Sequence, residues 1–186
     1  MDRRIKYTKK VITDTFLELI DKKDINKITV SEICELSDIN RGTFYRYYDN
    51  VYDLLDKIEA EFVNELVNAT KVDDEEYSVS SFVSVLLNVF VENKKLVKVL
   101  FDSKNTLQLL NDVLIISYNK CKEKWEKDLP NIDEQDEEYA ALFIFNGALG
   151  VINFWVKNNF DKEPDEIAKI IEQLSYYGTK RFIYSR

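Results

Sequence analysis

Glycine and proline are so scarce in this chain that they limit what it can fold into. Only four glycines and two prolines occur among 186 residues. Hairpins and tight turns depend on both, because glycine readily adopts positive φ angles and proline pre-sets the φ angle of a turn. Apolar residues also recur at intervals of three and four rather than alternating along the chain. The sequence therefore predicts an all-α fold.

The first fifty residues are predicted to form one long helix and two short ones. Helical spacing covers 3–23. Thr29 and Glu32 then form a T-x-x-E capping box at the start of a second helix, whose inward residues are Ile33 and Leu36. Beyond a break near Ser37 and Asp38, the third helix runs over 41–48 with Asn40 as its N-cap.

This spacing is typical of a helix-turn-helix, in which two short helices follow a longer amphipathic one. We therefore assign 1–50 to a helix-turn-helix DNA-binding domain. Residues 51–186 form the second part of the chain, to which the family resemblance given below assigns a linker helix followed by a C-terminal regulatory and dimerisation domain. The helices predicted in this second part cover 51–69, 79–92, 94–102, 106–127, 134–158 and 165–184, with Pro164 at the start of the last one.

Charge is divided unevenly between the two parts. The chain carries a net charge of −8, yet residues 1–50 hold ten Lys and Arg against nine Asp and Glu. Five of these cations lie within the first ten residues: Arg3, Arg4, Lys6, Lys9 and Lys10. A polyanion would therefore be met locally, by the N-terminal end.

The third predicted helix has features that packing alone explains poorly. Gly42 in the first turn weakens a helix. Phe44 and Tyr48 share an inward face, which leaves Tyr45, Arg46 and Tyr47 pointing outward. Contact with DNA would account for these features, because arginine reads guanine edges or phosphate and tyrosine hydroxyls bind phosphate. A surface helix whose tyrosines cover a neighbouring element is the alternative.

These residues also resemble a known family. The run Ile39-Asn40-Arg41-Gly42-Thr43-Phe44-Tyr45-Arg46-Tyr47-Tyr48, preceded by Ile28-Thr29-Val30 and followed by Leu54-Leu55, is similar to the N-terminal signature of TetR family transcriptional regulators, in a Firmicutes-type branch. The resemblance is dense over about 5–62. Farther on, Gly147-Ala148-Leu149-Gly150 and Trp155 resemble a C-terminal domain of that branch.

The resemblance implies about nine helices, of which three bind DNA, the fourth links, the middle ones form a ligand pocket and the last two make a dimer. It places Arg41, Thr43, Tyr45 and Tyr47 on the recognition helix, with Ser31 facing DNA from the second helix. Where the family often has a phosphate-binding lysine, this chain has Val51. The full set of predicted DNA-binding residues is Thr29, Ser31, Asn40, Arg41, Gly42, Thr43, Tyr45, Arg46 and Tyr47.

The C-terminal part carries two further predictions. The run 139–156 has no charged residue. We expect the helix that contains it and the last helix to pack against the same two helices of a second chain, forming a homodimer. The expected interface residues are Gly147, Gly150, Ile167, Ile170, Ile171 and Leu174. Large rings in the middle helices suggest a cavity for a small apolar or aromatic effector. The expected pocket residues are Phe82, Phe90, Phe101, Tyr118, Trp125, Phe143 and Trp155.

Other functional classes are disfavoured. The sequence contains no histidine, which removes the commonest general base and metal ligand, so we expect no catalytic residue, metal or cofactor. Cys34 and Cys121 are too few for a metal knuckle and are expected to be inert core thiols. The run 139–156 is long enough to span a bilayer. Its asparagines and glycines instead favour a buried helix in a cytoplasmic protein without a signal peptide. A helical protein-binding adaptor, or an activator of the same fold, remains as an alternative function.

Overall fold

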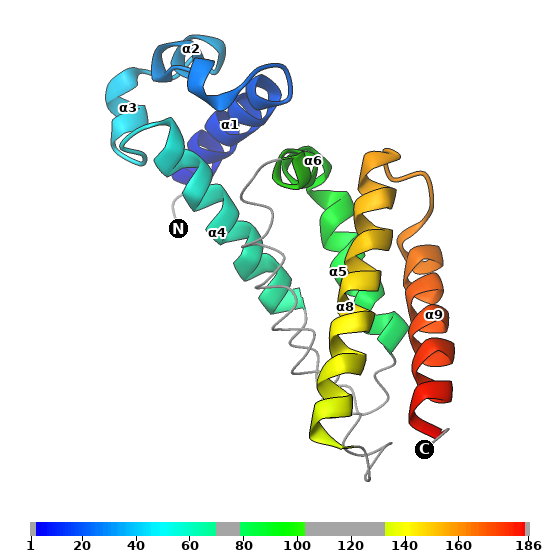
Figure 1. Ribbon diagram of the computed structural model, residues 1–186. Helices are drawn as coiled ribbons and strands as arrows, with labels where there is room; N and C mark the ends of the chain where they lie inside the picture. Colours follow the sequence, from blue (N-terminus) through cyan, green and yellow to red (C-terminus); the bar gives the residue numbers. More distant parts are fainter. Residues whose placement is uncertain (1–2, 70–78, 103–132, 185–186) are drawn as a thin grey trace. The chain divides into compact units, whose positions relative to one another are not determined.

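The computed structural model describes residues 3–69, 79–102 and 133–184, all of which are shown in Figure 1. Eight α-helices and one short 3-10 helix lie within these ranges, and no strand does. The predicted all-α class is therefore confirmed. The predicted helix over 106–127 lies outside the described residues. The chain divides into two compact units, Met1–Asn64 and Glu65–Arg186, which are described separately below.

Unit 1 contains α1 (Arg3–Ile20), η1 (Ile25–Lys27), α2 (Val30–Leu36), α3 (Arg41–Tyr45) and most of α4 (Val51–Ala69). These bounds agree with the predicted helices except at two ends: α1 stops at Ile20, and α3 stops at Tyr45. The buried side chains include Ile12, Phe16, Leu19, Ile28, Ile33, Phe44, Tyr48, Leu54, Ile58 and Phe62. Each helix thus contributes one apolar stripe to a shared core, as amphipathic spacing requires.

One inward residue of α2 was predicted wrongly. Ile33 is fully buried as expected, but Leu36 is 62% exposed. The helix buries Cys34 and Ser37 in its last turn instead. Ser37 satisfies its hydroxyl locally by donating to the carbonyl of Ile33, at 2.6 Å. A small polar residue is therefore buried at the end of α2, because its hydrogen bond is made within its own helix.

Unit 2 contains α5 (Val79–Glu92), α6 (Lys94–Asp102), α8 (Glu134–Lys157) and α9 (Pro164–Tyr184). α9 packs against both α5 and α8, and Figure 1 shows α8 and α9 side by side. Pro164 is the first residue of α9, where its missing amide costs no hydrogen bond. The predicted bounds of these four helices are confirmed to within a residue.

The connection between α8 and α9 is a Schellman turn. The amide of Phe160 donates to the carbonyl of Trp155 at 2.9 Å, and that of Asn159 donates to Val156 at 3.0 Å. Asn159 and Phe160 both have positive φ angles, 61° and 59°. The rings of Trp155 and Phe160 pack edge to face with centroids 4.8 Å apart. This ring contact accompanies the motif and holds a strained pair of residues in place.

The rings predicted to line a ligand pocket fall into two groups. Phe82, Phe90, Phe101 and Trp155 are buried in unit 2. Phe143 is 67% exposed and lies on another face of the unit. Tyr118 and Trp125 are outside the described residues.

Within the described part of the chain, Gln135–Lys157 of α8 is long and apolar enough to cross a membrane by length and composition alone. Only 28% of its most apolar window is buried inside the unit.

Candidate nucleic-acid interface

The start of α2 is fixed by one half of the predicted capping box. The Thr29 hydroxyl accepts a hydrogen bond from the amide of Glu32 at 3.2 Å. The Glu32 carboxylate bonds instead to the Lys23 ammonium, at 2.6 Å. Thr29 therefore caps the helix as expected, and the lysine ties α2 to the end of α1.

The turn between α2 and α3 depends on a residue in the left-handed region. Asp38 has a φ of 54°, and the following amide, of Ile39, donates to the carbonyl of Cys34 at 3.0 Å. This is the same Schellman arrangement that ends α8, with an aspartate in the position that usually holds glycine. Burial raises the pKa of the neighbouring Cys34 thiol, which keeps it protonated, as an inert core thiol would be.

α3 begins at a well-formed N-cap. The side-chain oxygen of Asn40 accepts from the amide of Gly42 at 2.8 Å. A Cβ atom added to Gly42 would lie 3.2 Å from that same oxygen. The cap itself thus gives a local reason for glycine at this position, in addition to the DNA contact predicted for this helix.

Two rings anchor α3 and leave its other face in solvent. Phe44 is fully buried and Tyr48 is 4% exposed, with ring centroids 5.5 Å apart. Burial raises the pKa of the Tyr48 hydroxyl. Arg41, Gly42, Tyr45 and Arg46 are exposed, and Thr43 and Tyr47 are half-buried. The predicted inward pair, Phe44 and Tyr48, and the outward positions of Tyr45 and Arg46 are therefore confirmed. Tyr47 is only half-buried, and it lies beyond the end of α3 rather than on the helix as predicted.

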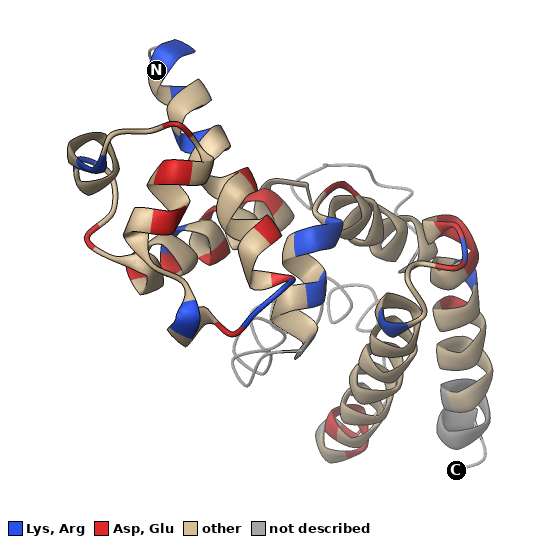
Figure 2. Ribbon diagram, turned by 90° about the horizontal axis from the view of Figure 1, so that it is seen from above, with Lys and Arg blue, Asp and Glu red and all other residues tan. Residues whose placement is uncertain are grey.

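The remaining predicted residues lie near this face or support it. Thr29 and Asn40 are exposed, but their side-chain oxygens already serve as helix caps. Ser31 is half-buried in the first turn of α2. Of the N-terminal cations, Lys9 forms an ion pair with Glu61 at 3.5 Å. Figure 2 shows basic residues at the N-terminal end of α1, while acidic residues are spread over the other helices. The assignment of these residues to DNA stays a prediction.

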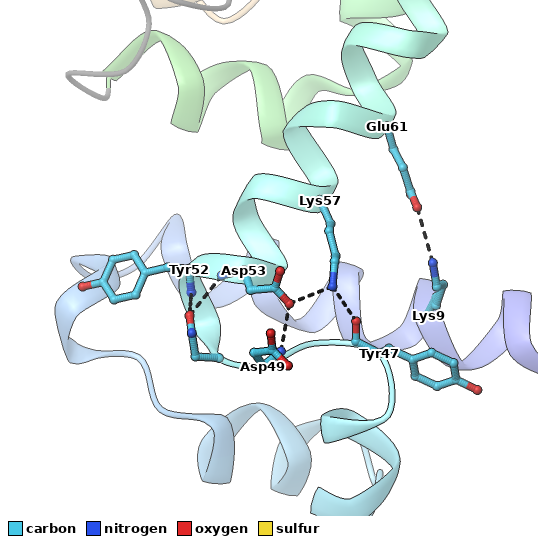
Figure 3. A network of polar contacts seen from close by, with 8 residues as sticks. Lys9, Tyr47, Asp49, Tyr52, Asp53, Lys57 and Glu61 are labelled. Atoms are coloured by element: carbon cyan, nitrogen blue, oxygen red, sulfur yellow. Dashed lines mark hydrogen bonds and ion pairs between the residues drawn. The ribbon is translucent and has the colours of Figure 1, made fainter.

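Sequence reasoning missed a polar network at the start of α4. Asn50 caps this helix by accepting from the amides of Tyr52 and Asp53. Val51, at the position where the resemblance led us to expect a lysine, is buried. Farther along, Lys57 bonds to both Asp53 and the backbone of Tyr47 (Figure 3). The four-residue spacing of Asp53 and Lys57 signals a pair within the helix, but it gives no hint of the backbone partner.

A second exposed surface lies in unit 2, between α8 and α9. A groove of about 650 Å³ is lined mostly by apolar residues of both helices. Its lining includes Phe143, Ile144, Gly147, Val151, Ile171, Leu174 and Tyr177. Three of the predicted interface residues, Gly147, Ile171 and Leu174, line this groove. Gly150 is exposed on α8 but is not part of the groove lining. Ile167 is buried and Ile170 is half-buried.

The comparisons with known proteins agree with this architecture. Residues 12–58 match the family model described as bacterial regulatory proteins, tetR family. Residues 77–177, more than half of the chain, match the model described as a transcriptional regulator C-terminal region. The second match includes all of α8, so the apolar run lies within the C-terminal region that this model describes.

Individual relatives were also found. The chain is 30% identical over 87 residues to DhaS of Lactococcus lactis subsp. lactis (strain IL1403), an HTH-type transcriptional activator of the dhaKLM operon; the match covers 47% of this chain and 45% of that protein. It is 39% identical over 56 residues to the HTH-type transcriptional regulator YxbF of Bacillus subtilis (strain 168), covering 30% of this chain and 15% of that protein. The chain thus matches less than half the length of these curated relatives.

Solved structures share the fold over nearly the whole chain. A structure of the dihydroxyacetone kinase operon activator DhaS has a TM-score of 0.69 at 20% identity and covers 93% of this chain and 96% of its own. A TetR-family regulator from Syntrophomonas wolfei has a TM-score of 0.69 at 16% identity, covering 96% and 95%.

A capped recognition helix, a helix-turn-helix and a C-terminal helical domain define a class of helical DNA-binding regulators. Together with the two family models, they show that the chain belongs to the TetR family of transcriptional regulators.

Proposed function

We propose that this chain is a cytoplasmic, ligand-responsive repressor that binds a pseudo-palindromic operator as a homodimer. The observation that carries the proposal is the outward face of α3, where exposed Arg41, Tyr45 and Arg46 surround a helix anchored by buried Phe44. Cations and hydroxyls on one face of a short helix suit a groove lined by phosphates. Residues 1–50 would bind DNA and residues 51–186 would link, sense and dimerise.

The dimer proposal is supported by the groove between α8 and α9. Phe143, Leu174 and Tyr177 are 67%, 61% and 72% exposed on this surface. Contiguous exposed apolar patches mark interaction surfaces in soluble proteins. A second copy of the chain offers the same apolar groove, so a twofold contact would cover both at once. One recognition helix per chain would then read two half-sites on one side of the duplex.

The effector proposal is supported by the large buried rings of unit 2. Phe90 and Phe101 pack edge to face with centroids 5.9 Å apart. A structure of SmeT with triclosan shares the fold at 16% identity and a TM-score of 0.65. An apolar or aromatic effector would bind among rings of this kind and favour one spacing of the two recognition helices. A tenfold change in DNA affinity would require about 1.4 kcal/mol of coupling.

Activation is the second candidate outcome, because the relative DhaS is described as an activator. Repression and activation use the same contacts to DNA and differ in where the operator lies relative to the promoter. The sign of regulation is therefore a property of the operator's position, which a reporter gene measures.

Selection of bound fragments from a genomic DNA pool tests the core of the proposal. Purified full-length chain should enrich short fragments that share an inverted repeat, and a reporter fused to such a fragment should change expression when the chain is supplied. Enrichment of no common sequence would overturn the proposed function and favour the protein-binding adaptor. Enrichment of a common site that lacks an inverted repeat would overturn the twofold dimer but would still support DNA binding.

The effector is tested separately, by thermal-shift screening of small apolar compounds followed by operator titration with each hit. Compounds that raise the melting temperature should also change operator affinity. Stabilising compounds that leave operator affinity unchanged would overturn the switch and leave only a binding cavity.

A further inference from the structure

The segment between α3 and α4 is held by a pair of side chains from α4. Five residues, 46–50, separate the end of α3 at Tyr45 from the start of α4 at Val51. The Lys57 ammonium donates a hydrogen bond to the backbone carbonyl of Tyr47 at 3.0 Å. It also pairs with the Asp53 carboxylate at 2.8 Å, and that carboxylate accepts from the amide of Asp49 at 2.8 Å. We call these contacts the α3–α4 clamp (Figure 3).

The clamp differs from an ordinary surface ion pair in what it joins. An exposed lysine and aspartate four residues apart on one helix contribute little by themselves. Here both side chains also bond to the backbone of the preceding segment, so α4 is tied to the end of the recognition helix. The hydrogen bond from Lys57, and then that from the amide of Asp49, lower the pKa of the Asp53 carboxyl. The carboxylate form that the clamp requires is therefore favoured.

Packing supports the same arrangement. The Lys57 ammonium lies 5.6 Å from the centroid of the Tyr48 ring, which is itself buried against Phe44. A second contact, the ion pair of Lys9 with Glu61, joins α1 to α4 one turn farther on. Lys57 thus contacts both the buried Tyr48 ring and the backbone carbonyl of Tyr47. Because both residues closely follow α3 in the chain, their positions depend on that of α3.

Figure 3 shows the carbonyl of Tyr47 facing Lys57 and the ring of Tyr47 pointing away from it. The backbone of a predicted DNA-contacting residue is therefore fixed from α4, while its side chain remains on the outer side. α4 continues without a break to Ala69. A rotation of α4 that moves Lys57 would also move the carbonyl of Tyr47, because the two are directly bonded.

We propose that Lys57 and Asp53 are positioning residues that set the angle of the recognition helix to α4, and so control operator selectivity, without contacting DNA. The proposal rests on the proposed function, since selectivity presupposes an operator.

The test compares full-length Lys57→Met, Lys57→Arg and Asp53→Asn with the wild-type chain. Methionine keeps an unbranched stem over the Tyr48 ring and removes the ammonium, whereas arginine keeps charged donors. Lys22→Met is the matched control, because it removes one exposed lysine of unit 1 that lies outside the clamp. Affinities for the selected operator and for a random-sequence duplex are measured over a series of salt concentrations.

Lys57→Met should lower the ratio of operator to random-sequence affinity by about tenfold, the order expected for one charged hydrogen bond. The salt slope should match that of Lys22→Met. Asp53→Asn should lower the ratio in the same direction, and Lys57→Arg should restore most of it. An unchanged ratio would overturn the proposal. Equal weakening on both duplexes, with the salt slope reduced by about one, would also overturn it, because Lys57 would then contact phosphate.

Amide hydrogen exchange tests the clamp without DNA. The Asp49 amide should exchange about tenfold faster in Asp53→Asn and in Lys57→Met, while amides in the middle of α1 keep their wild-type rates. Unchanged exchange at Asp49 would show that the clamp does not order the segment. If the wild-type chain selects no operator, the proposed function fails while this measurement still decides the clamp. If Lys57→Met does not fold, the affinity ratio and the hydrogen exchange are both measured on the near-isosteric Asp53→Asn.

Discussion

The two units of this molecule expose aromatic side chains to a similar extent, but with different neighbours. In unit 1, Tyr45 is 55% exposed and stands between the exposed cations Arg41 and Arg46 along the chain. In unit 2, Phe143 and Tyr177 are 67% and 72% exposed and line an apolar groove. Exposure alone therefore does not identify a partner. Cations among the rings favour a polyanion, whereas a continuous apolar surface favours another apolar surface.

The units also differ in how their helices are stabilised. α3 has five residues and α2 has seven, far below the length at which a helix is stable alone. Both begin at a side-chain cap and are joined by a turn with a left-handed residue. In unit 2, α8 has 24 residues and α9 has 21, and they depend on packing along their length. Both units have an apolar core, but the short helices of unit 1 depend more on their caps and turn than the long helices of unit 2 do.

The largest effect is expected from Phe143→Glu, which places a charge in the groove of unit 2. In a twofold dimer the substitution would bring two carboxylates into one interface, at a cost of several kcal/mol. Sedimentation should show a 22.0 kDa monomer at micromolar concentration, whereas the wild-type chain is expected to sediment as a dimer. Tyr7→Glu is the matched control, since Tyr7 is 68% exposed in unit 1 and should leave the dimer intact. A dimer that persists in Phe143→Glu would place the interface elsewhere.

On the other side of the comparison, Arg41→Ala should weaken operator binding by about 1–3 kcal/mol and relax selectivity at one base pair, as expected for an arginine that reads guanine. Tyr45→Phe should instead weaken binding to every sequence about equally, because it removes one hydroxyl that we expect to contact phosphate. Titration of each variant with the operator and with single-base variants separates the two effects. Operator affinity unchanged in Arg41→Ala would mean that α3 is oriented differently on DNA.

The sequence predicted those parts of the fold that depend on short-range signals. Asn40 is recognisable as a cap because cap residues precede helices at fixed positions. The structure shows the corresponding hydrogen bond, from the amide of Gly42 to the side-chain oxygen of Asn40. The bounds of α4 followed from an unbroken apolar stripe. The exposed side chain of Leu36 was missed, because seven residues define the buried face of a helix only loosely.

The clamp could not have been predicted in the same way. Lys57 bonds to a backbone carbonyl ten residues earlier in the chain, and any residue type supplies such a carbonyl. Likewise, nothing in the sequence distinguishes Phe143 from the buried Phe90, since both lie in strongly apolar helices. The difference arises from which face of each helix its neighbours cover, which periodicity alone leaves undetermined.

A smaller effect is expected at Glu137, the one charged residue that is buried in α8 among the residues that the structure describes. Glu137 is 8% exposed, and among the described residues its Oε1 atom is buried without a hydrogen-bond partner. An unsatisfied buried polar group costs about 1–3 kcal/mol, so Glu137→Leu should raise the free energy of unfolding by an amount within that range. The adjacent and exposed Glu138→Leu should change it by less than about 0.5 kcal/mol. Urea unfolding of both variants gives the comparison, and a loss of stability in Glu137→Leu would show that this carboxylate is paired in solution.

The smallest effect concerns the turn that the two units have in common. Asp38 ends α2 with a φ of 54°, and Asn159 ends α8 with a φ of 61°. A side chain is unfavourable in this region, although aspartate and asparagine tolerate it better than most residues. Asp38→Gly should therefore relieve backbone strain in the folded chain. Glycine also increases the entropy of the unfolded chain, and with that cost subtracted the free energy of unfolding should rise by about 0.5 kcal/mol. Glu35→Gly, three residues earlier in right-handed α2, should lower it by up to about 1 kcal/mol. Urea unfolding without DNA keeps the lost charge of Asp38 from affecting the result through DNA binding. If both glycine variants lost stability alike, the aspartate side chain would be contributing more to this turn than its backbone strain costs.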